Sequence, residues 1–151
     1  MNNKKFPTRK LLRMQNYDYS NMGVYFITIC SRGKEKIFGD IITGKNVELT
    51  LNENGKIIKN YIENIDELLI YKIMPNHVHI LLLLDEESRK NNRSVPMIVR
   101  SLKSLSSKKI GFSCWQRSYH DRIVRNKREF EMIWNYIEHN EETWNRDCYN
   151  V

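Results

Sequence analysis

Apolar residues along this chain are spaced as in strands in some segments and as in helices in others. Residues 24–30, VYFITIC, are rich in β-branched and aromatic side chains and predict a strand that is covered on both faces. Two more apolar runs, centred on Ile73 and Ile80, predict strands that meet at Pro75 and Asn76. A connection this short predicts antiparallel pairing of the two strands.

Three other segments repeat their apolar residues every three or four positions, which predicts helices. The first begins near Asn52, the second follows Ser94 as N-cap with Pro96 in its first turn, and the third runs from about Lys127 to Thr143. The predicted packing positions are Ile57, Ile58, Tyr61, Ile62, Ile65 and Leu68 or Leu69 in the first, Met97, Ile98, Leu102 and Leu105 in the second, and Phe130, Ile133, Trp134 and Ile137 in the third.

Residues 38–51 predict a small hairpin around a Thr-Gly-Lys-Asn turn, and residues 114–124 predict a last strand. The order is then strand, hairpin, helix, two strands, helix, strand, helix. It predicts an α+β sandwich of the ferredoxin-like (split βαβ) kind, with a central antiparallel sheet and a C-terminal helix that carries a tyrosine. We expect residues 1–151 to form one domain, with residues 1–16 as a basic arm; for residues 1–8 a disordered tail is the alternative to an arm on nucleic acid.

Charge favours an acidic partner. Lys and Arg number 25 against 18 Asp and Glu, which gives a net charge of +7, and nucleic acid and an anionic membrane surface both suit that balance. Residues 88–120 contain no acidic residue, and a one-sided block of this length favours contact with phosphates over a merely solvated face. The candidate nucleic-acid-binding residues in and after this block are Arg100, Lys103, Lys108, Lys109, Arg117, Arg122 and Arg125.

The cysteines and the apolar runs restrict the compartment. Three scattered cysteines without a CxxC pair indicate neither a disulfide framework nor a cysteine zinc site. No run approaches the roughly 20 apolar residues that a membrane helix needs. We therefore expect a soluble cytoplasmic protein with no membrane partner, associated with the nucleoid if it is bacterial.

Two histidines open the strand around Ile80. Successive side chains of a strand alternate between faces, so His77 and His79 lie on one face and Val78 on the other. Imidazoles are frequent ligands of divalent metals, and a same-face pair is a candidate metal site. The alternative is a pair of packed, hydrogen-bonded core histidines.

The last helix offers two further candidates, Tyr136 and Asn140, four residues apart on one flank. If this helix packs beside the histidine strand, Asn140 completes a mixed imidazole and oxygen site that suits Mg²⁺ or Mn²⁺. Tyr136 could then attack a phosphate. The alternative for Tyr136 is a packing role at the edge of the apolar stripe, and Tyr119 is a competing nucleophile without an amide partner at helical spacing.

Other polar and aromatic residues have simpler interpretations. His120 is expected to pack or to face DNA rather than to bind metal, and His139 to be solvated on the helix surface. Trp115 and Trp134 are expected in the core, with base stacking as the alternative for Trp115.

Four segments together resemble a known family. Residues 74–81, MPNHVHIL, resemble the HUH motif (histidine, hydrophobic, histidine) of the single-tyrosine (Y1) transposases of the IS200/IS605 kind, and residues 136–140, YIEHN, resemble their tyrosine helix. Residues 17–30 and 115–126 are similar to the branch called REP-associated tyrosine transposases. The resemblance extends over about residues 11–144.

The resemblance implies a DNA nicking and joining enzyme that acts on single-stranded DNA near a hairpin or palindromic repeat. Tyr136 would be the nucleophile that keeps the 5′ phosphate, and His77, His79 and Asn140 would hold the metal. Relatives occur as homodimers and as monomers, so either state is open. Many relatives have Pro after the Asn, whereas this chain has Glu141, and the alternative of a non-catalytic or domesticated nucleic-acid-binding module is kept.

Overall fold

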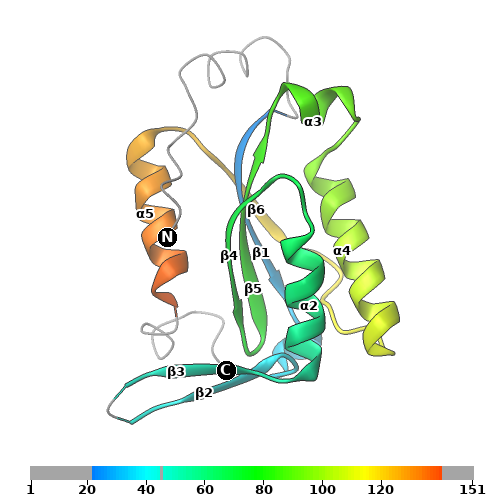
Figure 1. Ribbon diagram of the computed structural model, residues 1–151, viewed down its shortest axis with the longest axis vertical. Helices are drawn as coiled ribbons and strands as arrows, with labels where there is room; N and C mark the ends of the chain where they lie inside the picture. Colours follow the sequence, from blue (N-terminus) through cyan, green and yellow to red (C-terminus); the bar gives the residue numbers. More distant parts are fainter. Residues whose placement is uncertain (1–21, 45, 141–151) are drawn as a thin grey trace.

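A four-stranded antiparallel sheet lies at the centre of the computed structural model, which describes residues 22–44 and 46–140 (Figure 1). The order of its strands is β4-β5-β1-β6, and all neighbours pair antiparallel. The bounds are Gly23–Cys30 for β1, Leu68–Met74 for β4, His77–Leu84 for β5 and His120–Val124 for β6. The antiparallel pair joined at Pro75 and Asn76 and the α+β fold class are confirmed.

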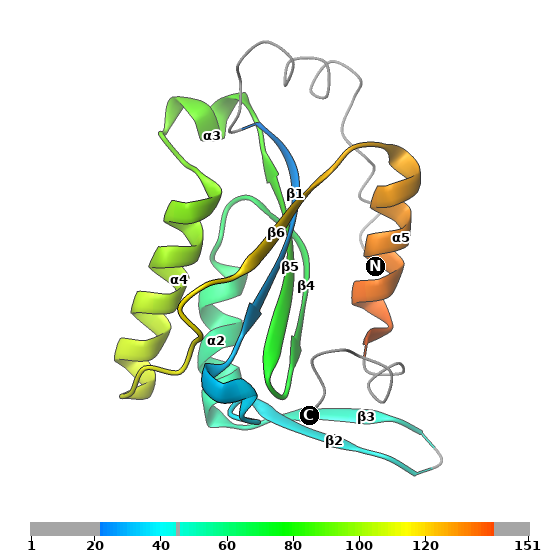
Figure 2. The same cartoon turned by 180° about the vertical axis from the view of Figure 1, so that it is seen from behind.

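Helices cover both faces of this sheet. Helices α2 (Glu53–Glu63) and α4 (Val95–Ile110) lie on one face, and α5 (Lys127–Glu138) lies on the other, as the two opposite views show (Figures 1 and 2). Each helix begins at a side chain that accepts a hydrogen bond from the first turn. These N-caps are Asn52, Ser94 and Asn126, which accept from the backbone N–H groups of Gly55, Met97 and Glu129.

Three short elements complete the fold. Strands β2 (Gly39–Ile42) and β3 (Glu48–Leu51) form the predicted hairpin, which runs along the end of the sheet where α5 also ends (Figure 1). A 3₁₀ helix, η2 (Arg32–Lys34), follows β1. The five-residue helix α3 (Glu86–Lys90) was not expected, since it is too short to show helical periodicity and is defined by the Asp85–Ser88 capping box.

Two predicted boundaries are corrected. The strand predicted over residues 114–124 is regular only as β6, because Trp115 forms an isolated bridge with Ser31 and its indole N–H donates to Ser106 on α4 at 2.9 Å. The helix predicted from Asn52 towards Leu69 ends at Glu63, and Leu68 already belongs to β4.

The last helix, predicted to run to about Thr143, ends earlier in the structure. Helix α5 stops at Glu138, with His139 as its C-cap. Residues 141–143 of the predicted helix and the predicted arm, residues 1–16, lie outside the described residues. Within the described ranges, no helix is long and apolar enough to cross a membrane.

Alternation along the strands produces two apolar clusters. One, under α2 and α4, contains Val78, Ile80, Leu82 and Leu84 of β5. The other, under α5, contains Leu81 of β5 with Phe130, Ile133 and Ile137. The α5 face is apolar only over part of its length, since the start of β5 places His77 and His79 on this face.

Candidate active site

The candidate site lies at the start of β5, on the sheet face that α5 covers. Strand register places Thr28 of β1 opposite His79. His77, His79 and Thr28 are 0%, 1% and 4% exposed, respectively. Burial of three polar side chains requires hydrogen-bond partners, and those partners define the site.

His79 joins the sheet to the tyrosine helix. Its Nδ1 atom lies 2.9 Å from the hydroxyl of Thr28, and its Nε2 atom lies 3.4 Å from the hydroxyl of Tyr136. The Tyr136 ring meets the imidazole edge-on, with ring centroids 5.2 Å apart. Tyr136 is also 37% exposed, so its phenol is accessible to a ligand while it contacts the histidine. The structure thus brings together the tyrosine and one of the two histidines singled out in the sequence.

His77 is held by the residue that precedes it. Its Nδ1 atom lies 2.8 Å from Oδ1 of Asn76. An amide oxygen only accepts, so Nδ1 of His77 carries the hydrogen and the lone pair of the neutral ring is on Nε2. Asn76 is itself oriented, because its Nδ2 donates to the carbonyl of Lys34 at 3.2 Å. This pair of hydrogen bonds presents His77 in the tautomer that a metal ligand needs.

The Asn76 turn is fixed by the segment after β1. The backbone N–H of Ser31 donates to the carbonyl of Asn76, and that of Phe38 donates to the carbonyl of Pro75, both at 2.9 Å. Lys34 adopts a φ of +55°, which is uncommon for a residue with a Cβ atom. Thr28 and Asn76 are the supporting residues that the sequence did not reveal; the position of Asn76 beside the first histidine was the one available signal.

Asn140 is four residues after Tyr136, beyond the C-cap of α5, and is fully buried. His77 and Asn140 have other interactions, but Nε2 of His77 and Oδ1 of Asn140 are buried atoms with no hydrogen-bond partner among the described residues. The rings of His77 and His79 are adjacent, with centroids 4.7 Å apart. Two imidazole nitrogens and a carboxamide oxygen are donors that fit a divalent cation.

Carboxylates and thiolates do not supply a metal site of their own here. Across residues 22–44 and 46–140, no group of three or more His, Cys, Asp or Glu side chains could hold a metal ion. The candidate donors are therefore the two histidines and Asn140.

The predicted basic residues are divided between the two sides of the sheet. Arg100, Lys103 and Arg117 line a hollow of 480 Å³ beside Trp115 on the α4 side, away from Tyr136. The ammonium of Lys103 donates to the carbonyls of Gln116 and Arg117 at 2.8 and 3.0 Å, and burial lowers its pKa.

The remaining basic candidates are exposed. Lys108 and Lys109 lie in the last turn of α4. Arg122 lies on β6, 3.5 Å from Glu129, and Arg125 follows that strand. Of the seven, Arg122 faces the α5 side, because it pairs with Phe26.

The alternative candidates fall elsewhere. Tyr119 packs against the cluster under α2 and α4, on the opposite face from the histidines. His120 is exposed on β6 and pairs with Thr28. Trp115 lies in the first core cluster, and Trp134 packs against the second, as expected.

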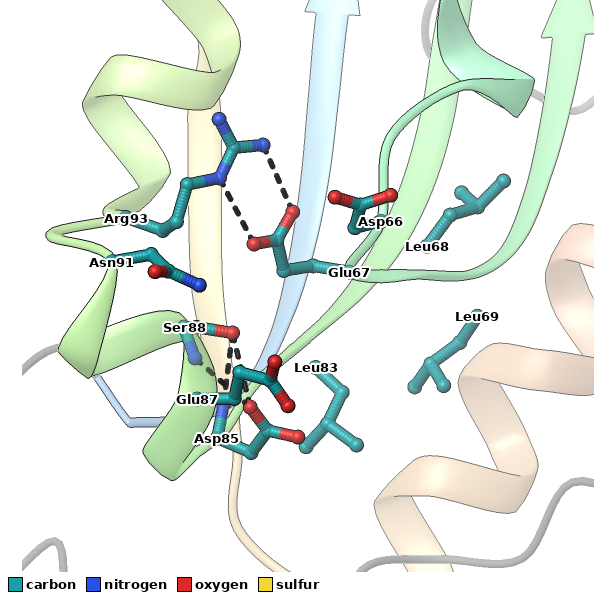
Figure 3. Close-up of a pocket in the computed structure, with 10 residues that line it drawn as sticks. All are labelled: Asp66, Glu67, Leu68, Leu69, Leu83, Asp85, Glu87, Ser88, Asn91 and Arg93. Carbon is teal, nitrogen blue, oxygen red and sulfur yellow. Dashed lines mark hydrogen bonds and ion pairs between the residues drawn. The ribbon is translucent and has the colours of Figure 1, made fainter.

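An acidic pocket of 370 Å³ lies at the opposite end of β5 (Figure 3). Asp66, Glu67, Asp85 and Glu87 contribute to its lining. Arg93 forms two hydrogen bonds of 2.9 Å with Glu67, which lowers the pKa of that carboxyl. Four carboxylates against one guanidinium disfavour an anionic ligand here, in contrast to the histidine end of the strand.

No protein-family model matches this chain. An uncharacterized protein of Haemophilus influenzae is 31% identical over 171 aligned positions, which cover 92% of this chain and 91% of that protein. A solved structure of a REP-associated tyrosine transposase bound to a REP hairpin is similar with a TM-score of 0.63 and 17% identity, over 82% of this chain and 68% of that one. A proposed transposase from Deinococcus radiodurans gives a TM-score of 0.51 at 19% identity, over 81% and 93% of the two chains.

Proposed function

We propose that this chain, which belongs to one family with the Haemophilus influenzae protein and has the fold of a REP-associated tyrosine transposase, is a metal-dependent enzyme that nicks and rejoins single-stranded DNA. The observation that carries the proposal is the contact between the Tyr136 hydroxyl and His79, beside the buried His77. Packing alone does not require a half-exposed phenol aimed at a pair of buried imidazoles.

The proposed step is an exchange of phosphate esters. The Tyr136 oxygen attacks the scissile phosphorus, the bond from phosphorus to the 3′ oxygen breaks, and the 3′ oxygen leaves as a hydroxyl with a proton. The 5′ phosphate stays on the tyrosine, and attack by a 3′ hydroxyl reverses the step and joins the strand. The number of phosphodiester bonds is unchanged, so neither an oxidant nor a nucleotide cofactor is needed.

His77, His79 and Asn140 are the residues proposed to hold the cation. Mg²⁺ or Mn²⁺ bound there would polarise the phosphate and offset the negative charge that develops during attack. The protein's own part is to orient both rings: Asn76 fixes His77, and Thr28 fixes His79. His79 also positions the phenol.

The proposed partner is a single strand that contains a hairpin or a palindromic repeat. The REP-associated relative was solved bound to a REP hairpin. The basic residues around Arg100 and Arg117 offer a surface for the stem that is separate from the site of cleavage.

The experiment incubates the protein with a hairpin-bearing single strand and Mn²⁺ or Mg²⁺, and then separates the products under denaturing conditions. We expect a covalent protein–DNA adduct that Tyr136→Phe abolishes and Tyr119→Phe leaves unchanged. His77→Ala should reduce the adduct strongly. An adduct of undiminished yield in Tyr136→Phe would contradict the assignment of the nucleophile.

The second candidate function is a non-catalytic module that binds structured RNA or DNA. It is favoured by the gathering of Arg100, Lys103 and Arg117 on the side away from Tyr136. It predicts salt-sensitive binding that His77→Ala and His79→Ala leave unchanged, with no adduct under any metal.

A further inference from the structure

A row of polar side chains crosses the sheet through the candidate site. His79 pairs with Lys72 of the edge strand β4 on one side and with Thr28 on the other, and Thr28 pairs in turn with His120 of β6. Directly paired residues of an antiparallel sheet point to the same face. The α5 face thus carries a cationic side chain, Lys72, beside His79 at the edge of the sheet.

A groove of 670 Å³ begins at Lys72. Strand β3 and the residue before it line it with apolar side chains, among them Val47 and Leu51, and α2 contributes Lys59. His139, at the C-terminal end of α5, lines it as well and is three residues beyond Tyr136. The groove therefore lies beside the site: β4, which lines it, pairs with the histidine strand, and His139 follows the tyrosine helix.

We propose that this groove binds the nucleotide next to the scissile phosphate of a single-stranded DNA substrate, an inference that rests on the proposed function. A strand whose phosphate lies at Tyr136 has to continue on either side of it. On the β4 side it meets Lys72 and Lys59, which suit the phosphates, and apolar side chains of β3, which suit the face of an unstacked base.

The chemistry of the lining favours this occupant over others. The lining contains two lysines, Lys59 and Lys72, and one carboxylate, Glu48, so the groove suits an anion. Lys72 on an edge strand also disfavours the addition of another protein's strand. Tyr71, which lines the groove too, donates its hydroxyl to Glu63, and burial together with this carboxylate raises its pKa above the ordinary value. The raised pKa disfavours the phenolate form of Tyr71.

The test uses the full chain with Tyr136→Phe, so that binding is measured without cleavage. Lys59→Ala is compared with Lys56→Ala, a matched control on the same helix whose ammonium pairs with Glu53 and which does not line the groove. The measurement is the affinity for a fluorescent single strand at several salt concentrations. We expect Lys59→Ala and Lys72→Ala to weaken binding and each to lower the slope of log affinity against log salt by about 1, and Lys56→Ala to leave it unchanged.

A second measurement maps the contact. A photoreactive thymidine analogue is placed one nucleotide from the cleavage position, and the crosslinked peptide is identified by mass spectrometry. Crosslinks to residues 47–51 or 71–73 support the groove. Crosslinks confined to α4, or equal effects of Lys59→Ala and Lys56→Ala, overturn it while the adduct assay still stands.

The outcomes separate the two proposals. If the protein forms the Tyr136 adduct but Lys59→Ala does not weaken DNA binding, only the proposal for the groove is contradicted. If Lys59→Ala weakens binding and the crosslinks map to the groove but no adduct forms, the groove is supported and the proposed strand-transfer activity is contradicted. Equal competition by a fully paired duplex for the Lys59-dependent binding would contradict a site for an unstacked base.

Discussion

The two faces of the sheet are built from alternate residues of the same strands, yet they differ in what they hold. On the face under α2 and α4, β5 contributes Val78, Ile80, Leu82 and Leu84 and is apolar along its length. The face under α5 takes Leu81 from the same strand but also the two histidines. Among the described residues, α5 is the helix that covers it (Figure 2). The first face supplies most of the buried apolar surface and thereby supports the polar site on the second.

Consecutive leucines of β5 test this difference most strongly. Leu81 and Leu82 are both fully buried, one on each face. We expect Leu82→Ala to lower the free energy of unfolding by about 4–5 kcal/mol and Leu81→Ala by about 2–3 kcal/mol, because one helix can settle into the smaller cluster more easily than two. Denaturant titration measures both. A cost for Leu81→Ala that equals or exceeds that of Leu82→Ala would show that the α5 face is packed as firmly as the other.

The next largest expected effect is on metal affinity, when the hydrogen-bond partner of His77 is removed. Asn76→Ala removes the acceptor of the Nδ1 hydrogen, and loss of such a supporting partner typically weakens metal binding about 10- to 100-fold. Titration with Mn²⁺ measures the affinity, and ¹⁵N shifts of the ring report the tautomer. Asn76→Asp is the control, since it keeps an acceptor for His77. Unchanged Mn²⁺ affinity in Asn76→Ala would remove Asn76 from the site.

The smallest expected difference between the two faces is in the stability that their ion pairs contribute. Glu67, with a side chain 6% exposed, pairs with Arg93 just before α4, whereas Arg122 and Glu129 pair at 3.5 Å beside α5 and are more exposed. We expect Glu67→Gln to cost about 1–1.5 kcal/mol at neutral pH and Glu129→Gln less than about 0.5 kcal/mol.

The Glu67 contribution should depend on pH. The Arg93 hydrogen bonds lower the pKa of Glu67 below its ordinary value of 4.5. Its stabilisation is therefore present above the unfolded pKa and is lost as the pH falls through the lower folded pKa. Denaturant titrations between pH 7 and pH 3 should show the stabilities of the wild type and Glu67→Gln converging. A constant difference down to pH 3 would contradict the linkage.

Local patterns in the sequence predicted those parts of the site that depend on one strand or one helix. The period of two placed His77 and His79 on one face, and the strand register confirms this. The period of 3.6 placed Tyr136 one helical turn before Asn140, but α5 ends at Glu138 and Asn140 lies beyond its C-cap. The supports could not be predicted, because they depend on residues that are distant in the sequence: Asn76 contacts Lys34, and His79 contacts Thr28.

The side of the sheet on which the basic residues lie could not be predicted from the sequence either. Arg100 and Lys103 were correctly placed on a helix that has Ser94 as its N-cap. No local pattern states which face of a sheet a helix will cover, so their separation from Tyr136 appears only in the structure. Their contact with nucleic acid stays a prediction.

The attachment of α5 has a consequence for the fate of a cut strand. After the proposed step, the DNA end would be covalently carried by a helix whose hold on the sheet comes from Phe130, Ile133 and Ile137. The residence time of that end beside the histidines would then equal the residence time of the helix. Faithful resealing would thus depend in part on the buried aliphatic and aromatic contacts under α5.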